Sequence, residues 1–372
     1  MKKNNLKKII IFYPSFERGG VENVLVNLIN FFLKQKIEIV LITSNIKKGL
    51  FKNKLFNCKY IKFAPFSFFP DRINKALSAS RTLKNELKKS DKKDTIVFSL
   101  QGSSLAIVIS KFFGFKIIVR NGEDVLGSTI YSENKIQSLI VLLFKVFLYN
   151  FADKIITNSK GSGNSLEKIL IKKKKIHPIY NPYLKKIYGN SKHKRNKYLI
   201  SIGRLVKEKD FHNLIIAFNF IKKEIPNYKL IIIGDGQLKN ELQNLVNNLG
   251  LNKRIIFTGW KLKLKKYYVN SKLFILNSLY EGLGNVVIDA ANYNLPIITT
   301  NCNSREIIDY GRGGFLVPIK NPRLLSRKIL FCLNNYKFSI KKSKYAKKRI
   351  KRFDCETNCN KYFKLISKTI NE

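Results

Sequence analysis

Acidic residues, cysteine, methionine and tryptophan are scarce in this chain of 372 residues, which has 24 Asp and Glu against 71 Lys and Arg. Its five cysteines include no CxxC pair and have no histidine partner at metal-site spacing. The pattern therefore gives no sign of a cysteine metal site and predicts free thiols in a reducing cytosol.

Long apolar runs are also missing, so a membrane-spanning helix is not expected. The nearest approach, residues 136–151, is too short and contains Lys145. The N-terminus has no small-residue cleavage site of a signal peptide, and its short apolar run before Pro14 is expected to be the first buried strand. With 45% hydrophobic residues the chain should fold, and its length suggests two domains.

The net charge of +47 suggests nucleic acid as a partner. The basic excess runs through the whole chain, however, and no stacking aromatics or base-reading motif accompany it. Lysine, asparagine and isoleucine are all abundant, as a bias in codon usage would produce. We therefore expect no nucleic-acid partner, whereas a basic surface favours contact with an anionic membrane leaflet.

Two series of short apolar runs alternate with longer amphipathic segments, which is typical of βα units and a parallel sheet. The first series comprises residues 8–12, 37–42, 95–100, 116–119 and 154–157, and the second 198–203, 229–234, 254–259, 273–277 and 296–300. A polar stretch at 189–197 reads as a linker. The sequence thus predicts an α/β fold with two doubly wound, Rossmann-like domains, whose ligands bind beyond the carboxyl ends of the strands.

The expected domain boundaries are 1–188 for the N-terminal domain and 198–335 for the C-terminal domain. Asn321 followed by Pro322 predicts the start of a helical region. Residues 336–372 should form a helical segment that packs back towards the N-terminal domain.

Glycines and cations mark the expected strand ends. Gly19 and Gly20 follow the first strand, where paired glycines let the backbone approach a ligand and a helix N-terminus attracts an anion. Such turns also contain glycine for steric reasons alone. Arg204 and Lys209 follow the strand at 198–203 and suit the clamping of a diphosphate, and Asp210 should cap the next helix.

The following unit carries a Gly-Asp-Gly turn at 234–236 and a helix expected to end at Gly250. A G-x-G without its third glycine is not a dinucleotide fingerprint, so this turn alone is weak evidence for a nucleotide site.

The segment NSLYEGLGNVVIDAANYNLPIITT at 277–300 combines two acids with a glycine turn. Backbone amides of Gly284, Asn285 and Val286, at the start of a helix, can face a phosphate. Glu281 can accept hydrogen bonds from sugar hydroxyls, and Asp289 can hold the vicinal hydroxyls of a ribose. Together these features indicate a nucleotide-sugar site.

In chain order, the motifs GGVE, GRLVKEK, GDG, TGW, YEGLGNVVIDA, LPIITT and REIIDYGRGGFLVP resemble the retaining GT-B glycosyltransferases of family 4 over residues 8–330. The resemblance implies that Glu281 and Asp289 are the two ends of an E-x7-E motif, which contact the donor sugar and the ribose. Arg204 and Lys209 would stabilise the diphosphate, while Gly19 and Gly20 approach donor phosphate and acceptor.

Two features depart from the family pattern. The second acid of the motif is Asp289 rather than Glu, one methylene shorter. Many relatives carry a histidine where this chain reads IIVRNGED, so Asn121 stands near that position, and Glu123 or Asp124 is an acceptor-side candidate. Glu22, in the GGVE motif, is a further acceptor-side candidate.

The function that this resemblance implies is metal-independent transfer of a hexose or N-acetylhexosamine to a hydroxyl of a lipid-linked glycan or polysaccharide of the cell envelope. The favoured donor is a UDP-sugar, and GDP-mannose is the alternative. Such an enzyme needs no cofactor, and no D-x-D motif for a metal–diphosphate is present. It would act in the cytoplasm at the inner face of the membrane, and the aromatic, basic residues 60–72 are a candidate docking segment. A GT-B sugar-nucleotide epimerase and a nucleic-acid-binding protein remain alternatives.

Overall fold

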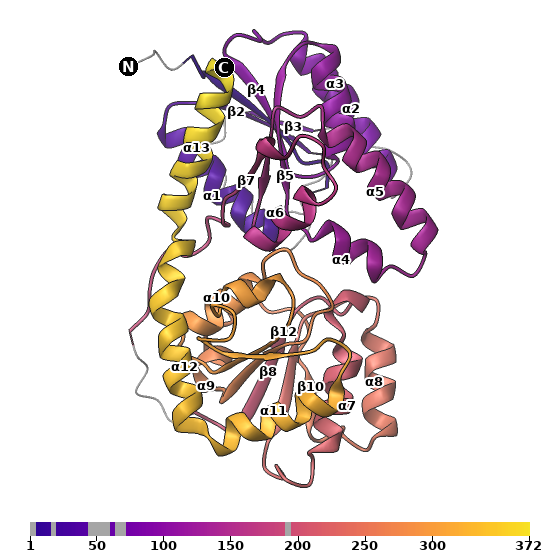
Figure 1. The fold of residues 1–372 in the computed structure, drawn as a ribbon, viewed down its shortest axis with the longest axis vertical. Helices are drawn as coiled ribbons and strands as arrows, with labels where there is room; N and C mark the ends of the chain where they lie inside the picture. Colours follow the sequence, from indigo (N-terminus) through magenta and orange to yellow (C-terminus); the bar gives the residue numbers. More distant parts are fainter. Residues whose placement is uncertain (1–4, 16–19, 44–59, 64–71, 190–194) are drawn as a thin grey trace. The chain divides into compact units, whose positions relative to one another are not determined.

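The computed structural model describes residues 5–15, 20–43, 60–63, 72–189 and 195–372 (Figure 1). Gly19, Cys58 and most of the expected docking segment 60–72 lie outside these ranges. The chain divides into two compact units, one formed by residues 1–185 with 353–372 and the other by residues 186–352. The helical segment expected at 336–372 is therefore divided between the units, with its second part in unit 1.

Unit 1 is built on a seven-stranded parallel sheet with the order β3-β2-β1-β4-β5-β6-β7. Its elements are β1 (Lys8–Phe12), α1 (Gly20–Lys34), β2 (Glu38–Thr43), β3 (Tyr60–Phe63), α2 (Arg72–Leu87), β4 (Thr95–Ser99), α3 (Ser103–Phe112), β5 (Lys116–Asn121), α4 (Val125–Ile130), α5 (Lys135–Tyr149), β6 (Lys154–Thr157), α6 (Lys160–Glu167), β7 (Ile176–Pro178) and α13 (Cys355–Asn371).

Unit 2 is built on a six-stranded parallel sheet with the order β10-β9-β8-β11-β12-β13. Its elements are β8 (Tyr198–Ile202), the 3-10 turn η3 (Lys207–Lys209), α7 (Phe211–Phe220), β9 (Lys229–Ile233), α8 (Lys239–Asn248), β10 (Ile255–Phe257), α9 (Lys265–Asn270), β11 (Leu273–Leu276), α10 (Asn285–Asn292), β12 (Ile297–Thr300), η4 (Asn303–Glu306), β13 (Phe315–Val317), α11 (Pro322–Asn334) and α12 (Tyr336–Arg349).

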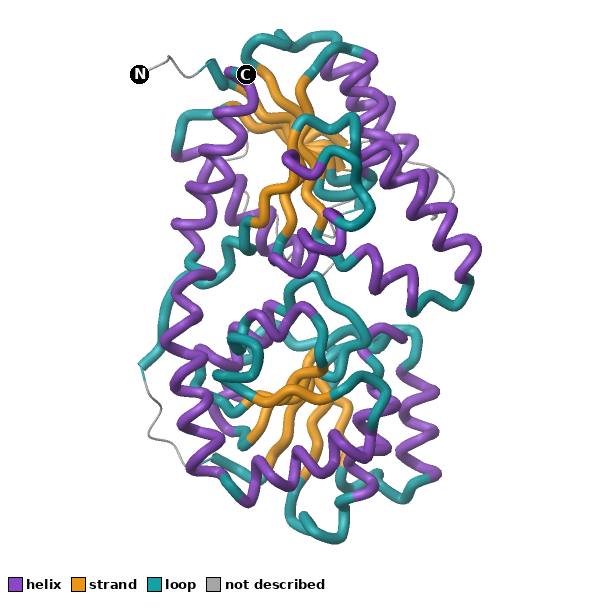
Figure 2. The backbone as a smooth tube through the Cα atoms, in the orientation of Figure 1, coloured by secondary structure: helices purple, strands orange, loops and turns teal. Residues whose placement is uncertain are grey.

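Helices cover both faces of each sheet, as the continuous apolar strands require (Figure 2). In unit 1 one core lies between the sheet and helices α1 and α13, and the other between the sheet and α2, α3 and α5. Strand residues alternate between these cores: Ile9 and Ile11 face the first, Ile10 and Phe12 the second. The prediction of two doubly wound Rossmann-like sheets is confirmed.

All ten predicted strands are present, with bounds shifted by up to two residues. The sequence pattern missed β3, β7 and β13, which are edge strands of three or four residues. Gly250 has φ of 65° directly after the last residues of α8, as predicted for a helix C-terminus. Cys302, Cys332, Cys355 and Cys359 are free thiols. Over the described ranges, no helix has the length and apolarity needed to cross a membrane.

Candidate functional site

The order of strands in unit 2 reverses between β8 and β11. From β8 the chain continues to β9 and β10 on one side, and from β11 to β12 and β13 on the other. The connections after β8 and β11 leave in opposite directions, and at such a switch point ligands of open α/β sheets bind beyond the carboxyl ends of the strands. Lys209 follows β8 and Glu281 follows β11, so both predicted residues stand at this switch point.

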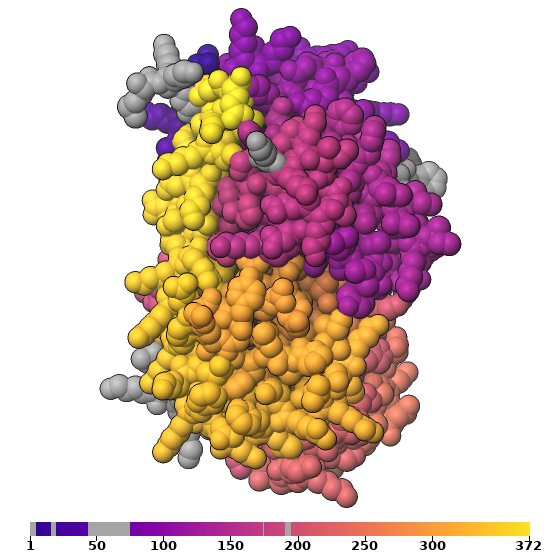
Figure 3. Space-filling model, in the orientation of Figure 1, coloured from indigo at the N-terminus to yellow at the C-terminus, as the bar shows by residue number. Residues whose placement is uncertain are grey.

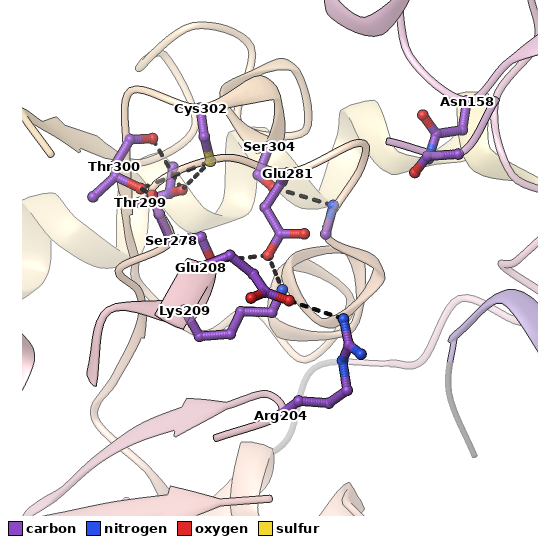
Figure 4. A network of polar contacts seen from close by, with 12 residues as sticks. Asn158, Arg204, Glu208, Lys209, Ser278, Glu281, Thr299, Thr300, Cys302 and Ser304 are labelled. Carbon is purple, nitrogen blue, oxygen red and sulfur yellow. Dashed lines mark hydrogen bonds and ion pairs between the residues drawn. The ribbon is translucent and has the colours of Figure 1, made fainter. Parts of the chain in front are cut away.

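Lys209 and Glu281 form an ion pair through Nζ and Oε1 (Figure 4). Their side chains are only 17% and 12% exposed. The Ser278 hydroxyl donates a second hydrogen bond to the same oxygen at 2.8 Å. Among the residues that the structure describes, none donates to the other oxygen, Oε2. The carboxylate is therefore fixed by one oxygen and retains the second as an acceptor.

Arg204, the other predicted cation, lies on the same turn but is 54% exposed. Its Nη2 contacts Glu208 Oε1 at 3.0 Å. The carbonyl of Glu208 accepts a hydrogen bond from the Leu279 amide at 2.8 Å, which joins the turn after β8 to the turn after β11. Arg204 thus lies at the edge of the switch point, and its exposed side chain can change conformation. The Lys209 side chain, in contrast, is held by its ion pair.

Two glycines hold this turn close to the sheet. The stem of Lys209 passes over Gly203, where a Cβ would lie 3.5 Å from Lys209 Cγ. Gly234, at the end of β9, has φ of 151°, and a Cβ there would lie 1.8 Å from the Gly203 carbonyl oxygen. Only glycine fits at 234, so its role in the predicted donor site is to let the turns after β8 and β9 pack together.

The start of α10 differs in one detail from the expectation that its first amides face a ligand. The Gly284 N–H donates to Ser304 Oγ at 3.1 Å, so this amide is already satisfied within the chain. A Cβ on Gly284 would lie 2.7 Å from that hydroxyl oxygen, so the close contact requires glycine. Asn285 and Val286 form the first turn of α10, and both are partly exposed.

Asp289 lies one turn after Asn285 on the partly exposed face of α10, and Tyr293, the partly exposed residue that follows the helix, comes one turn later. Burial raises the pKa of the Tyr293 phenol, and the neighbouring Tyr188 and Asp289 raise it further. Tyr293 stacks on Tyr268 with ring centroids 5.4 Å apart. The aromatic stack therefore packs against the helix face on which Asp289 is carried.

The prediction that the Asp210 side chain caps α7 is wrong. Asp210 is the residue before the helix, but its φ of 46° is left-handed and its side chain makes no capping hydrogen bond. Burial raises the pKa of this carboxyl from its usual 3.8 to about 6. Its carbonyl oxygen accepts from Asn277 Nδ2 at 2.8 Å, another contact between the ends of β8 and β11.

The acceptor-side candidates lie in unit 1 and are engaged in local contacts. Gly20, predicted to bind the donor, belongs to the same unit and is the exposed first residue of α1. Glu22 is buried and accepts a hydrogen bond from the Tyr13 hydroxyl at 3.1 Å. Asn121 Nδ2 donates to the Glu123 carbonyl at 2.6 Å, and the Glu123 carboxylate pairs with Lys145 at 2.6 Å. Lys145 lowers the pKa of Glu123, which favours an ion pair over a general base.

Sequence reasoning missed the residues that orient the predicted ones: Ser278, Ser304 and Glu208. A hydroxyl directly after a strand is a weak signal, because its partner depends on how neighbouring turns pack. Glu208 had a clearer signal, since it stands four residues after Arg204 on the turn that carries both predicted cations.

Two family models match the chain. The model described as glycosyl transferases group 1 covers residues 185–349, and the model of glycosyltransferase family 4 covers residues 18–183. The first range contains every strand of the sheet of unit 2, and the second contains every strand of the sheet of unit 1 except β1.

Similar proteins match this chain over about half of its length in one case and nearly all of it in another. An N-acetylgalactosaminyltransferase of Campylobacter jejuni, named for the acceptor N-acetylgalactosamine-N,N'-diacetylbacillosaminyl-diphospho-undecaprenol, is 27% identical over 94% of this chain and 96% of its own length. An uncharacterized glycosyltransferase of Methanocaldococcus jannaschii is 38% identical over 48% of this chain and 47% of its own length.

Solved structures share the fold. Anabaena HepE in complex with UDP and glucose has a TM-score of 0.80 at 19% identity, covering 97% of this chain and all of that one. Sucrose-phosphate synthase from Thermosynechococcus elongatus has a TM-score of 0.81 at 15% identity, covering 97% and 98%.

Proposed function

The chain belongs to the GT-B glycosyltransferases of family 4, and from this premise we propose that it transfers a hexose or N-acetylhexosamine from a UDP-sugar to a hydroxyl of a lipid-linked glycan, with retention of the anomeric configuration. The observation that carries the proposal is the Lys209–Glu281 pair at the switch point of unit 2. A cation and a carboxylate at this position support the binding of a sugar diphosphate there.

In this proposal Lys209 and Arg204 stabilise the negative charge that develops on the leaving diphosphate. The first-turn amides of α10 add positive potential from the helix N-terminus. Glu281 accepts hydrogen bonds from the donor sugar through Oε2, and Asp289 accepts from the ribose. The departing phosphate takes the proton of the acceptor hydroxyl on the same face of the sugar, so the reaction needs neither a protein base nor a metal ion.

The donor and the lipid-linked acceptor are inferred from relatives. HepE has been solved with UDP and with UDP-glucose, and the Campylobacter relative is named for an undecaprenyl-diphosphate acceptor. GDP-mannose is the alternative donor. Action at the inner face of the cytoplasmic membrane follows from the acceptor class and is part of the proposal.

The test is a screen of radiolabelled nucleotide sugars against synthetic polyprenyl-diphosphate glycans, with and without EDTA. We expect transfer from a UDP-sugar at a rate that EDTA leaves unchanged. The anomeric configuration of the new linkage, read by NMR, should be the same as that of the donor sugar. Transfer only to soluble acceptors would overturn the lipid-linked part. A changed nucleotide sugar formed without any acceptor would favour the epimerase.

A further inference from the structure

Helix α5 of unit 1 carries an unusual number of apolar side chains on its exposed surface. Its sequence is KIQSLIVLLFKVFLY, and among its buried residues are Leu142, Leu148 and Tyr149. Seven other apolar residues of the helix are at least half exposed: Ile136, Leu139, Ile140, Val141, Leu143, Phe144 and Phe147. We call these seven side chains the apolar face of α5.

The apolar face is continuous and extends beyond the helix. Ile136, Ile140, Phe144 and Phe147 follow one another at helical spacing along one stripe. Phe151, which is 50% exposed, makes an edge contact with Phe147 at a centroid distance of 5.3 Å. Soluble proteins rarely leave so large a contiguous apolar patch exposed unless it binds something. In Figures 1 and 3 this part of the chain lies at the surface of its unit.

Lysines gather at the C-terminal end of α5. Lys175 Nζ donates to the carbonyl oxygens of Asn150 and Ala152, and the Lys172 amide donates to Asn150 Oδ1 at 3.2 Å. Burial lowers the pKa of Lys175, and the nearby charges of Lys172, Lys111 and Lys154 lower it further. We call these four residues the lysine cluster. Beside it, Ile171 is 86% exposed.

No acidic residue stands between Glu133 and Asp153. Asp153 is itself paired with Lys111 at 2.6 Å. Two acids from other elements approach this surface, Glu123 paired with Lys145 of α5 and Glu372 paired with Lys154. The helix itself contributes no acid, so the surface that borders the apolar face is cationic at its C-terminal end.

We propose that the apolar face of α5 docks on the surface of an anionic lipid bilayer, with the helix lying in the interface and the lysine cluster on the lipid headgroups. The proposal deepens the proposed function, because an enzyme whose acceptor is anchored in a bilayer must meet it at the bilayer surface.

Helix length and charge favour this occupant over others. Fifteen residues rise about 22 Å, less than the roughly 30 Å hydrocarbon core, so α5 can lie in the interface but cannot span it. A two-fold interface uses the same patch twice, so a second copy of the chain would add lysines to the contact and not anionic groups. Anionic headgroups complement both the lysine cluster and the apolar stripe.

The residues 60–72, expected from the sequence to dock on a membrane, are a different segment. Tyr60–Phe63 forms strand β3, and 64–71 lie outside the described ranges. In this proposal α5, and not residues 60–72, docks on the membrane. From the sequence, the stretch that forms α5 was evaluated only as a membrane-spanning helix.

The test measures flotation of the full-length protein with vesicles of phosphatidylethanolamine and phosphatidylglycerol, and with vesicles of phosphatidylcholine alone. The native protein should float with the anionic vesicles. The double variant Ile140→Glu/Phe144→Glu should lose this partition about tenfold or more, because two charges enter the apolar face. A matched double variant in unit 2, Leu262→Glu/Phe220→Glu, makes the same change in charge at exposed apolar positions and should float like the native protein.

A second pair of variants tests the charge. Lys172→Glu/Lys173→Glu changes one exposed lysine of the cluster and its exposed neighbour and should weaken flotation. Lys261→Glu/Lys263→Glu, at exposed lysines of unit 2, should weaken it less. Native protein that does not float, or α5 variants that float like the control, would overturn the proposal. So would a native dimer in sedimentation velocity that the α5 variant dissociates, since the face would then belong to a second copy.

Enzyme assays separate this inference from the proposed function. The α5 double variant should keep thermal stabilisation by UDP and transfer to a short-chain, water-soluble acceptor, and lose transfer to acceptor held in vesicles. A protein that floats but transfers no sugar contradicts the proposed function alone. A protein that transfers sugar to every acceptor but does not float contradicts the docking alone.

Discussion

Lys209 is held between a glycine and a carboxylate, and this arrangement makes its charge testable apart from its packing. Its stem covers Gly203 while its ammonium meets Glu281. The Lys209→Met variant keeps an unbranched stem over the glycine and removes the charge. We expect turnover to fall by about 10²-fold or more, because a preorganised cation for the leaving diphosphate is lost.

The control for this variant is Lys207→Met, two residues away on the same turn and exposed. Its turnover should stay close to that of the native enzyme. Steady-state kinetics with the cognate UDP-sugar measure both variants, and circular dichroism checks their folding. Equal activity of the two variants would remove Lys209 from the proposed chemistry.

Asp210 predicts a pH dependence of stability. Its carboxyl has a pKa of about 6 in the folded chain, above the usual 3.8, because burial disfavours the charged form. Between these two values the folded protein binds more protons than the unfolded chain, so this residue's contribution to stability falls as pH rises. Asp210→Asn removes the charge and suits the left-handed φ of 46°.

Asp210→Asn should therefore melt at a higher temperature than the native protein above pH 6 and at nearly the same temperature near pH 4. Differential scanning calorimetry at several pH values measures the difference. Glu224→Gln, at an exposed carboxylate, is the control and should shift the melting temperature little at any pH. A stabilisation by Asp210→Asn that is equal at all pH values would contradict the assignment to ionisation.

The residue types at the strand ends were predictable, and their partners were not. Lys209 and Glu281 follow apolar runs that could only be strands, so the carboxyl edge of a parallel sheet had to collect them. Which group each one meets depends on the turns. The sequence does not encode locally that Ser278 donates to Glu281 or that Ser304 accepts from Gly284.

At the scale of elements, the packing between the turns after β8 and β9 rests on Gly234. A side chain there would collide with the Gly203 carbonyl and force the left-handed φ of 151° on a residue with a Cβ. We expect Gly234→Ala to lower the free energy of unfolding by about 2–4 kcal/mol. It should also lower activity, because the displaced turn carries Arg204 and Lys209.

Gly250→Ala is the matched control, since Gly250 also has a left-handed φ but a Cβ there meets open space. It should cost about 1 kcal/mol and leave activity unchanged. Urea unfolding and steady-state kinetics compare the two variants. Similar losses in both would mean that the conformation of Gly234, and not its contact with Gly203, decides the outcome.

The apolar character of each run, more than the length of the strand it forms, explains which elements the sequence pattern found, since the edge strand β10 has only three residues and was predicted. The ten predicted strands are mostly runs of apolar residues that are buried on both faces, a pattern that few loops share. Strands β7 and β13 have three residues each, and β7 ends at Pro178, which lacks an amide hydrogen and suits an edge. Their pairing is decided by the neighbouring strand rather than by their own composition.

At the scale of the whole chain, the C-terminal helix α13 completes the core of unit 1. Ile366 and Tyr362 are fully buried there, with Phe98 in edge contact with the Tyr362 ring at 6.1 Å. The buried Arg120 donates through Nε to the Tyr362 hydroxyl at 3.1 Å and through Nη2 to Asn181. Amphipathic spacing predicted that this segment is a packing helix, but only long-range contacts determine which sheet it covers.

This arrangement predicts that a change near the C-terminus destabilises the N-terminal sheet. Ile366→Ala should cost about 3 kcal/mol, as should Ile329→Ala in α11 of unit 2, because both isoleucines are fully buried. In hydrogen exchange followed by mass spectrometry, Ile366→Ala should raise exchange in β1 and β4, which contribute to the same core. Ile329→Ala should instead raise it in β8, β9 and β12. If both variants raised exchange in the same peptides, the two units would unfold together, and α13 would not belong to the stability of unit 1 alone.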